Sequence, residues 1–182
     1  MDLSELVKVG EPAPFFEMPS TRNLDTLEEV VTLDDYRGKW LVLFFYPYDF
    51  SFVCPTEILA FSDRYDEFLA LGSDILGVST DSVYSHRAWL QTPQEKNGIQ
   101  GTKFILGSDT THSVSKAYGV LVQDEGVAQR GLFIIDPEGV LQYSVVHNMN
   151  IGRSVSETLR VLEALQAGGM CGANWEPGED TL

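Results

Sequence analysis

The clearest feature of the hydrophobic pattern is a continuous apolar run, WLVLFFY, at positions 40–46. A run without polar alternation predicts a β-strand that is buried on both faces. Four further apolar segments predict strands at 74–80, 103–108, 130–136 and 141–146. The sequence DPEG between the last two is typical of a tight turn, so they are expected to form a hairpin.

Helical spacing appears between these strands. Residues 55–72 predict one helix, because apolar positions recur there every three or four residues: Ile58, Phe61, Tyr65 and Phe68. Segments 82–91 and 111–119 predict two shorter helices. A last helix is expected at 154–166, where Ser154 and Glu157 have the spacing of a capping box.

The order of these elements is strand, helix, strand, helix, strand, hairpin and helix. This order predicts an α/β sheet of thioredoxin-like type with an N-terminal extension. We expect one domain over residues 1–166, followed by a C-terminal arm at 167–182 that is rich in glycine and acidic residues. Catalytic and binding sites in such sheets favour the carboxyl ends of strands.

Composition narrows the class of protein. A chain of 182 residues with 43% hydrophobic and 21% charged residues is typical of a globular domain, and it contains no apolar run long enough to span a membrane. The net charge of −15 argues against nucleic acid as a partner. The N-terminal sequence has neither a basic start nor an apolar signal core, so we expect a cytoplasmic protein.

Only two cysteines are present, at positions 54 and 171. Their separation excludes a CxxC motif and a cysteine-rich zinc site, and a transient catalytic disulfide is the usual reason for such a pair in the cytosol. Cys54 follows the first buried strand, where the N-terminus of the next helix would favour a thiolate. Pro55 suits the first helical position.

An arginine would favour the thiolate further, and the predicted fold could supply Arg130 or Arg153. A buried, inert core thiol is the alternative reading of Cys54, since most free cysteines are of that kind. The residues alone leave both readings open.

The segment FFYPYDFSFVCPTEI, residues 44–58, closely resembles the active-site segment of the typical two-cysteine peroxiredoxins, the group that includes alkyl hydroperoxide reductase C. That family's motif is a proline, three residues, a threonine or serine, two residues and a cysteine. Pro47, Ser51 and Cys54 match it here. The resemblance continues in matching order through four later segments, at residues 85–90, 124–136, 152–165 and 171–178.

The resemblance implies a thiol-dependent peroxidase that reduces hydrogen peroxide and organic hydroperoxides. Cys54 would be the peroxidatic cysteine, attacking the terminal peroxide oxygen and becoming a sulfenic acid. Ser51 would hydrogen-bond the peroxide or the thiolate, and Pro47 would shield the site from water. Arg130 would stabilise the thiolate and the charge that develops as the O–O bond breaks.

The resemblance also implies supporting residues and partners. Glu57 and Arg153 match positions that orient the arginine network. Cys171 would be the resolving cysteine, forming a disulfide with Cys54 of a partner subunit, and a thioredoxin-like protein or a flavoprotein disulfide reductase would reduce it. A homodimer, paired through strand 141–146, and a ring of five dimers are implied. No metal or organic cofactor is expected.

The chain departs from the family at several positions. Ser51 replaces the commoner threonine, Tyr48 stands where leucine is common, and Met170 and Gly172 flank Cys171 after a short connection. The Gly-Gly-Leu-Gly loop of relatives that are easily over-oxidised is replaced by NGIQG at 97–101, and we expect no counterpart of their C-terminal Tyr-Phe helix after the residues GEDTL. We therefore predict resistance to over-oxidation.

Other residues and functions receive plainer interpretations. The three histidines, His86, His112 and His147, have no ligand spacing and are predicted to be structural or exposed. Trp89 is expected in a core or an interface, and Trp175 is expected to anchor the arm. Two rival functions are a redox-regulated chaperone and a peroxide sensor that oxidises a partner protein. A non-catalytic binding module would not need Cys54 and Arg130 together.

Overall fold

The computed structural model describes residues 7–182, and its centre is a five-stranded mixed sheet in the order β5-β4-β3-β8-β9. Strands β3, β4 and β5 are parallel, whereas β8 is antiparallel to β3 and β9 is antiparallel to β8. The five strands are β3 (Trp40–Phe45), β4 (Ser73–Ser79), β5 (Ile105–Ser108), β8 (Arg130–Ile135) and β9 (Leu141–His147). All five strands predicted from the sequence are confirmed, within two residues at their ends.

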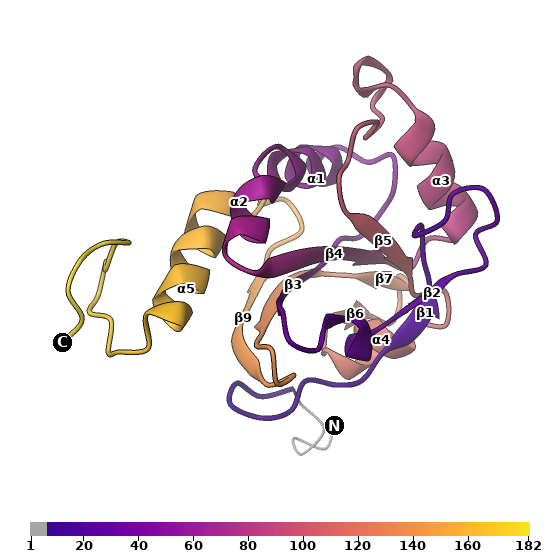
Figure 1. Ribbon diagram of the computed structural model, residues 1–182. Helices are drawn as coiled ribbons and strands as arrows, with labels where there is room; N and C mark the ends of the chain where they lie inside the picture. Colours follow the sequence, from indigo (N-terminus) through magenta and orange to yellow (C-terminus); the bar gives the residue numbers. More distant parts are fainter. Residues whose placement is uncertain (1–6) are drawn as a thin grey trace.

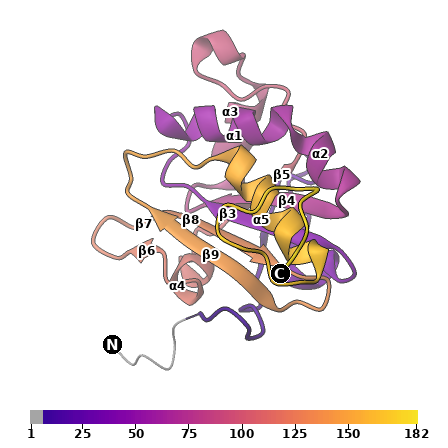
Figure 2. The ribbon, with the colours of Figure 1, turned by 90° about the vertical axis from the view of Figure 1, so that its left-hand side faces the viewer.

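Helices cover both faces of this sheet. In Figure 1, α1 and α2 lie above the sheet, α4 lies below it, and α5 and α3 flank it on opposite sides. The helices are α1 (Val53–Asp63), α2 (Tyr65–Ala70), α3 (Val83–Gln91), α4 (Ser113–Ala117) and α5 (Val155–Ala167), with 3₁₀ turns η2 (Leu33–Tyr36) and η3 (Gln94–Lys96). The turned view in Figure 2 shows the C-terminal arm lying along α5. The predicted α/β thioredoxin-like fold is confirmed.

Two hydrophobic cores form because alternate residues of each strand face opposite sides of the sheet. Val42 and Phe44 of β3 pack with residues of α1, α3 and α5 on one side. Leu43 and Phe45 pack on the other side with α4 and with the segment before β3. Every residue from Leu41 to Tyr46 is fully buried, which explains the unbroken apolar run.

Some predicted boundaries were wrong for local reasons. The single helix expected over 55–72 is two helices, because Arg64 leaves helical torsions at φ −105° and ψ 14°. The apolar residues keep one face through the break, so spacing could not reveal it. The helix expected at 111–119 begins only at Ser113, since His112 has a left-handed backbone with φ 61°.

Four short strands escaped prediction because two or three residues carry no periodicity. They form two small antiparallel pairs: β1 (Glu17–Pro19) with β2 (Val30–Thr32), and β6 (Leu121–Val122) with β7 (Val127–Ala128). The turn at 136–139 is confirmed by a hydrogen bond of 2.9 Å from the Gly139 amide to the Asp136 carbonyl. Within the described residues, no helix is long and apolar enough to cross a membrane.

Candidate active site

The register of the sheet brings three distant segments to one edge. Phe44 of β3 pairs with Leu132 of antiparallel β8, so the carboxyl end of β3 meets the start of β8 at Arg130. Arg130 pairs in turn with His147, the last residue of β9. The loop carrying Cys54, the arginine at the start of β8 and the connection from β9 to α5 therefore converge at this edge.

Cys54 lies in the first turn of α1 and is fully buried. The helix begins at Val53, so the prediction that Pro55 takes the first helical position was wrong by two residues. Proline is also tolerated at the third position, because the first four N–H groups of a helix have no intrahelical partner. The partial positive charge of this helix end favours an anionic sulfur.

Arg130 is the direct partner of this sulfur. Its Nη1 donates to Sγ of Cys54 at 3.2 Å and to Oε2 of Glu57 at 2.8 Å. Its Nε donates to the carbonyl oxygen of Met149 at 2.6 Å. Arg130 is only 3% exposed, so its guanidinium is fixed from two sides while one nitrogen faces the thiol.

Glu57 and Arg153 form the second layer of the site. Arg153 donates to both carboxylate oxygens of Glu57, from Nε at 2.8 Å and from Nη2 at 2.9 Å, and its backbone amide adds a third bond at 2.8 Å. Nη1 of Arg153 donates to the carbonyls of Phe45 and Gly131 at the ends of β3 and β8. The carboxylate therefore links the two arginines to each other and to the sheet.

The electrostatics of this cluster favour negative charge on sulfur. Burial alone would raise the pKa of the Glu57 carboxyl, but the hydrogen bonds and charge of Arg153, with the charge of Arg130, outweigh burial and lower that pKa below its ordinary value. The carboxylate is thus ionised between two guanidinium groups, which leaves a single net positive charge beside Cys54. A thiolate would neutralise the cluster.

Ser51 and Pro47 occupy the loop between β3 and α1. The Ser51 hydroxyl donates to the Tyr48 carbonyl at 2.9 Å, so its proton is used within the loop rather than on the Cys54 sulfur. Pro47 is buried, two residues after the end of β3. The loop places both residues before Cys54, and their roles toward a peroxide stay predictions.

Cys171 lies away from the cluster, at the other end of α5. Its sulfur is 3.7 Å from the carbonyl oxygen of Ala164, whereas α5 begins at Val155 beside Arg153. The nine residue-to-residue steps from Val155 to Ala164 correspond to about 14 Å along a helix axis. A disulfide requires Cα atoms within about 7 Å of each other, so this placement does not join Cys171 to Cys54 of the same chain.

The arm that carries Cys171 is held on α5 by Trp175. This side chain is only 6% exposed, its Nε1 donates to the Glu179 carbonyl, and its own carbonyl accepts a bond of 2.8 Å from Arg160. Trp175 therefore anchors the arm, as predicted. Ser154 caps α5 as its spacing indicated, but the Glu157 carboxylate binds Arg160 instead of completing the capping box.

Sequence reasoning missed several contacts in and around the site. The carbonyl of Met149 has no side-chain signature, so no pattern could find it. The side chain of Asn97 donates to the carbonyls of Phe50 and Ser51 at 3.2 and 3.0 Å. His86, predicted to be structural or exposed, is fully buried, and its spacing of three residues from Trp89 could have placed it on the buried face of α3.

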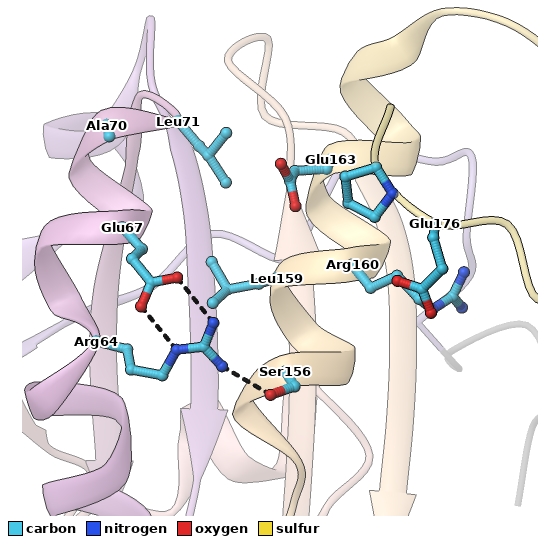
Figure 3. A pocket seen from close by; sticks show the side chains of 10 residues that line it. Arg64, Glu67, Ala70, Leu71, Ser156, Leu159, Arg160, Glu163 and Glu176 are labelled. Atoms are coloured by element: carbon cyan, nitrogen blue, oxygen red, sulfur yellow. Dashed lines mark hydrogen bonds and ion pairs between the residues drawn. The ribbon is translucent and has the colours of Figure 1, made fainter. Parts of the chain in front are cut away.

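A hollow of about 390 Å³ lies apart from these residues, between α2 and α5 (Figure 3). Leu71 and Leu159 form part of its wall. Arg64 at its rim is already bound to Glu67 by two bonds of 2.7 Å and to Ser156 by another of 2.7 Å. The side chains lining this hollow include no thiol and no histidine, so the cluster around Cys54 is the better candidate for chemistry.

Comparison with known proteins supports this choice. The model of the AhpC/TSA family matches residues 9–144. The chain is 51% identical to 2-Cys peroxiredoxin BAS1, chloroplastic, of Spinacia oleracea, over 98% of this chain and 68% of that protein. It is 49% identical to Peroxiredoxin-2 of Rattus norvegicus, over 96% of this chain and 89% of that protein.

A solved structure is similar over almost the same extent. The reduced 2-Cys peroxiredoxin of Plasmodium vivax superposes with a TM-score of 0.90 at 43% identity, covering 94% of this chain and 91% of that one. The similarity therefore extends through the sheet, the site and the helix that leads to the arm. Because the spinach protein is chloroplastic by its name, the cytoplasmic location of this chain stays a prediction.

Proposed function

This chain belongs to the AhpC/TSA family and is a thiol-dependent peroxidase of the two-cysteine peroxiredoxin type, and we propose that Cys54 is its peroxidatic residue. The observation that carries the proposal is the bond of 3.2 Å from Arg130 Nη1 to the buried Cys54 sulfur. A guanidinium fixed at that distance stabilises a thiolate, which is the form of cysteine that attacks peroxides.

The first chemical step is a displacement at oxygen. The Cys54 thiolate attacks the terminal oxygen of hydrogen peroxide or an organic hydroperoxide, an S–O bond forms, and the O–O bond breaks. Water or an alcohol leaves after taking a proton, the sulfur is oxidised to a sulfenic acid, and the peroxide is reduced. Arg130 would stabilise the leaving oxygen as well as the thiolate, because its Nη1 faces the reacting atom.

Glu57 and Arg153 would act through Arg130. They hold one side of its guanidinium while the Met149 carbonyl holds the other, so the charge is positioned before peroxide arrives. Pro47 would keep water from the sulfur. Ser51 would orient the peroxide, with its hydroxyl oxygen accepting a hydrogen bond from the substrate while its own hydrogen remains donated to the Tyr48 carbonyl.

Cys171 would complete the cycle across a subunit boundary. Its thiolate attacks the Cys54 sulfenic acid, an S–S bond forms, the S–O bond breaks, and the hydroxyl takes a proton and leaves as water. The position of Cys171 beside Ala164, at the far end of α5, favours resolution by the partner's cysteine. A thioredoxin-like protein or a flavoprotein disulfide reductase would then return both cysteines to thiols.

Resolution by a partner's cysteine requires at least a dimer, and β9 is the edge through which that homodimer would form. β9 is an edge strand of the sheet, with one side of its backbone free to pair, and Val146 on it is 48% exposed. Pairing of two β9 edges would join the sheets of the two chains into one continuous sheet. The ring of five such dimers is a prediction from the family resemblance.

Peroxide consumption by purified protein with a thioredoxin-coupled reductant tests the proposed activity. Wild type is expected to turn over hydrogen peroxide and cumene hydroperoxide, and Cys54→Ser is expected to have no activity with either. Cys171→Ser should reduce one equivalent of peroxide per subunit. Its turnover with thioredoxin as the reductant should then stop. Turnover by Cys54→Ser would overturn the assignment of the peroxidatic residue.

A further inference from the structure

The connection from β9 to α5, residues 148–153, supplies backbone groups to both halves of the active-site cluster. The carbonyl oxygen of Met149 accepts from Nε of Arg130 at 2.6 Å, and the amide of Arg153 donates to Oε1 of Glu57 at 2.8 Å. The direction of a backbone carbonyl depends on the torsions on either side of it. The contact to Arg130 therefore depends on how this connection is folded.

Asn148 shapes the connection as the first residue of a tight turn. Its backbone carbonyl accepts from the Ile151 amide at 2.9 Å, and its side-chain Oδ1 accepts from the Asn150 amide at 3.0 Å. Asparagine is favoured at this position of a turn, because its side chain can accept from the amide two residues later. The carbonyl of Met149 takes part in neither bond, so it is free to accept from Arg130.

Both ends of the connection are fixed by other elements. Arg130, the first residue of β8, pairs with His147, the last residue of β9, so Asn148 leaves the sheet directly beside the arginine. At the other end Gly152 packs on α1, where a Cβ added to it would lie 3.5 Å from Cγ1 of Val53. The side chain of Asn148 closes the turn between these two fixed points.

The contact with Met149 completes the orientation of a planar group. The guanidinium of Arg130 is rigid, so acceptors on two different nitrogens fix both its position and its tilt. Oε2 of Glu57 accepts from Nη1 at 2.8 Å, and the Met149 carbonyl accepts from Nε. Without the second acceptor the group could rotate about its contact with Glu57, and Nη1 would no longer be held 3.2 Å from the Cys54 sulfur.

We propose that Asn148 is a positioning residue for peroxide reduction. Its turn aims the Met149 carbonyl, and that carbonyl holds Nη1 of Arg130 toward the Cys54 sulfur and the peroxide oxygen that leaves. Asn148 is exposed and bonds to its own turn rather than to the reacting atoms, so it acts through Met149 and Arg130. The inference deepens the proposed function and rests on it.

Stopped-flow kinetics on the full chain measures the effect on this step. Asn148→Ala is expected to lower the second-order rate constant of Cys54 with hydrogen peroxide about fivefold, the factor that one ordinary hydrogen bond represents. Asn148→Asp keeps an oxygen that can accept from the Asn150 amide, so it should restore the rate constant to within about twofold of wild type.

Asn23 provides a matched control. In the connection between β1 and β2, Oδ1 of Asn23 accepts from the Asp25 amide at 3.0 Å, which is the same kind of bond that Asn148 makes. This connection lies beside β5, at the opposite edge of the sheet from β9, because Ser20 bridges to Gly107. Asn23→Ala should therefore lower the free energy of unfolding by an amount similar to Asn148→Ala while leaving the rate constant unchanged.

Alkylation of Cys54 by iodoacetamide separates help to the leaving oxygen from a general change in the thiol. The reagent reacts with the same sulfur, but iodide leaves instead of an oxygen anion, so the reaction gains less from a fixed Arg130. At the same pH, Asn148→Ala should slow alkylation by less than about twofold while it slows peroxide reduction about fivefold.

Three outcomes would overturn the proposal. A rate constant of Asn148→Ala equal to that of wild type would mean that the side chain does not position Arg130. An Asn148→Asp variant as slow as Asn148→Ala would assign the loss to something other than the acceptor. Equal slowing of peroxide reduction and alkylation would mean that Asn148 affects the thiol in general. In each case Cys54 still reacts with peroxide, whereas the proposed function fails only if Cys54→Ser retains turnover.

Discussion

The Nη1 atom of Arg130 lies 3.2 Å from the sulfur of Cys54, and both side chains are buried. The two residues are 76 positions apart in sequence, and the antiparallel pairing of β3 with β8 brings them together. This geometry turns an otherwise ordinary core thiol into a charge-stabilised nucleophile. Most of the predictions below follow from it or from the residues that support it.

Arg130→Lys is expected to slow the reaction of Cys54 with hydrogen peroxide by about 100-fold, as for the loss of one preorganised donor in other enzymes. A lysine carries its donors on a single nitrogen, which cannot replace the fixed contacts of Arg130 to Cys54, Glu57 and Met149. Stopped-flow measurement of the second-order rate constant checks this.

The matched control for that variant is Arg22→Lys. Arg22 is an exposed arginine paired with Asp35, far from the site in sequence, and its replacement should leave the rate constant unchanged. Equal rate constants for Arg130→Lys and wild type would show that the guanidinium geometry is not needed.

Glu57→Gln is expected to lower the free energy of unfolding by about 3 kcal/mol, because it leaves two buried guanidinium groups without their carboxylate. Denaturant unfolding measures the change. Glu67→Gln, which breaks an exposed pair with Arg64, is the control and should have little effect. If the free energy of unfolding falls by the same small amount in both variants, the buried network does not stabilise the fold.

The lowered pKa of Glu57 also makes the stability of the fold depend on pH. The pKa of Glu57 in the folded state lies below its ordinary value of 4.5, so the folded state prefers the ionised carboxyl. Its contribution to stability is fully present above about pH 4.5 and is lost as the pH falls through the lower folded value. The difference in unfolding free energy between wild type and Glu57→Gln should therefore shrink between pH 5 and pH 3, and a constant difference would contradict it.

The hydrogen bonds of the Asn97 side chain should affect how readily Cys54 is over-oxidised. The family's loop sequence is replaced here by NGIQG, yet the Asn97 side chain ties this loop to the carbonyls of Phe50 and Ser51. Asn97 has φ 61°, so glycine fits its backbone while removing both bonds. Asn97→Gly should open the active-site loop, residues 47–52, more easily and lower the fraction of Cys54 sulfinic acid at a given peroxide dose by about fivefold.

Mass spectrometry of Cys54 after titration with peroxide measures that fraction. Gln94→Ala is the control next to this loop, because the Gln94 side chain donates to the Gln100 carbonyl rather than to Phe50 or Ser51. Wild type itself is predicted to resist over-oxidation, and extensive sulfinic acid at a modest excess of peroxide would contradict that prediction. A higher sulfinic fraction in Asn97→Gly would show that Asn97 does not hold the loop closed.

The sequence revealed the fold more fully than it revealed the site. The run at 40–46 predicted β3 because burial on both faces removes every polar position. Arg130 and Arg153 could be named as candidates from the predicted topology, but their shared carboxylate on Glu57 was available only through the family resemblance. Patterns of apolar residues report burial, and they carry no information on which polar groups meet inside.

Other contacts lay beyond any pattern. The Met149 carbonyl is a backbone group in a turn, so its position depends on the folded connection from β9 to α5. The pairing of Asp49 with His86 joins a loop to a helix 37 residues later, and no spacing rule relates them. The break at Arg64 was hidden because Phe61 and Phe68 remain buried on the same side of the chain.

The most direct test of the central account is non-reducing electrophoresis with mass spectrometry on a mixture of two variants, Cys54→Ser and Cys171→Ser, exchanged into mixed dimers. Each variant retains one cysteine of the pair and carries a distinct mass tag. After one equivalent of hydrogen peroxide, the account predicts a covalent dimer of one chain of each kind, joined between Cys54 and Cys171. Oxidised Cys54 without any such cross-link, from chains confirmed to be mixed, would contradict resolution by the partner subunit.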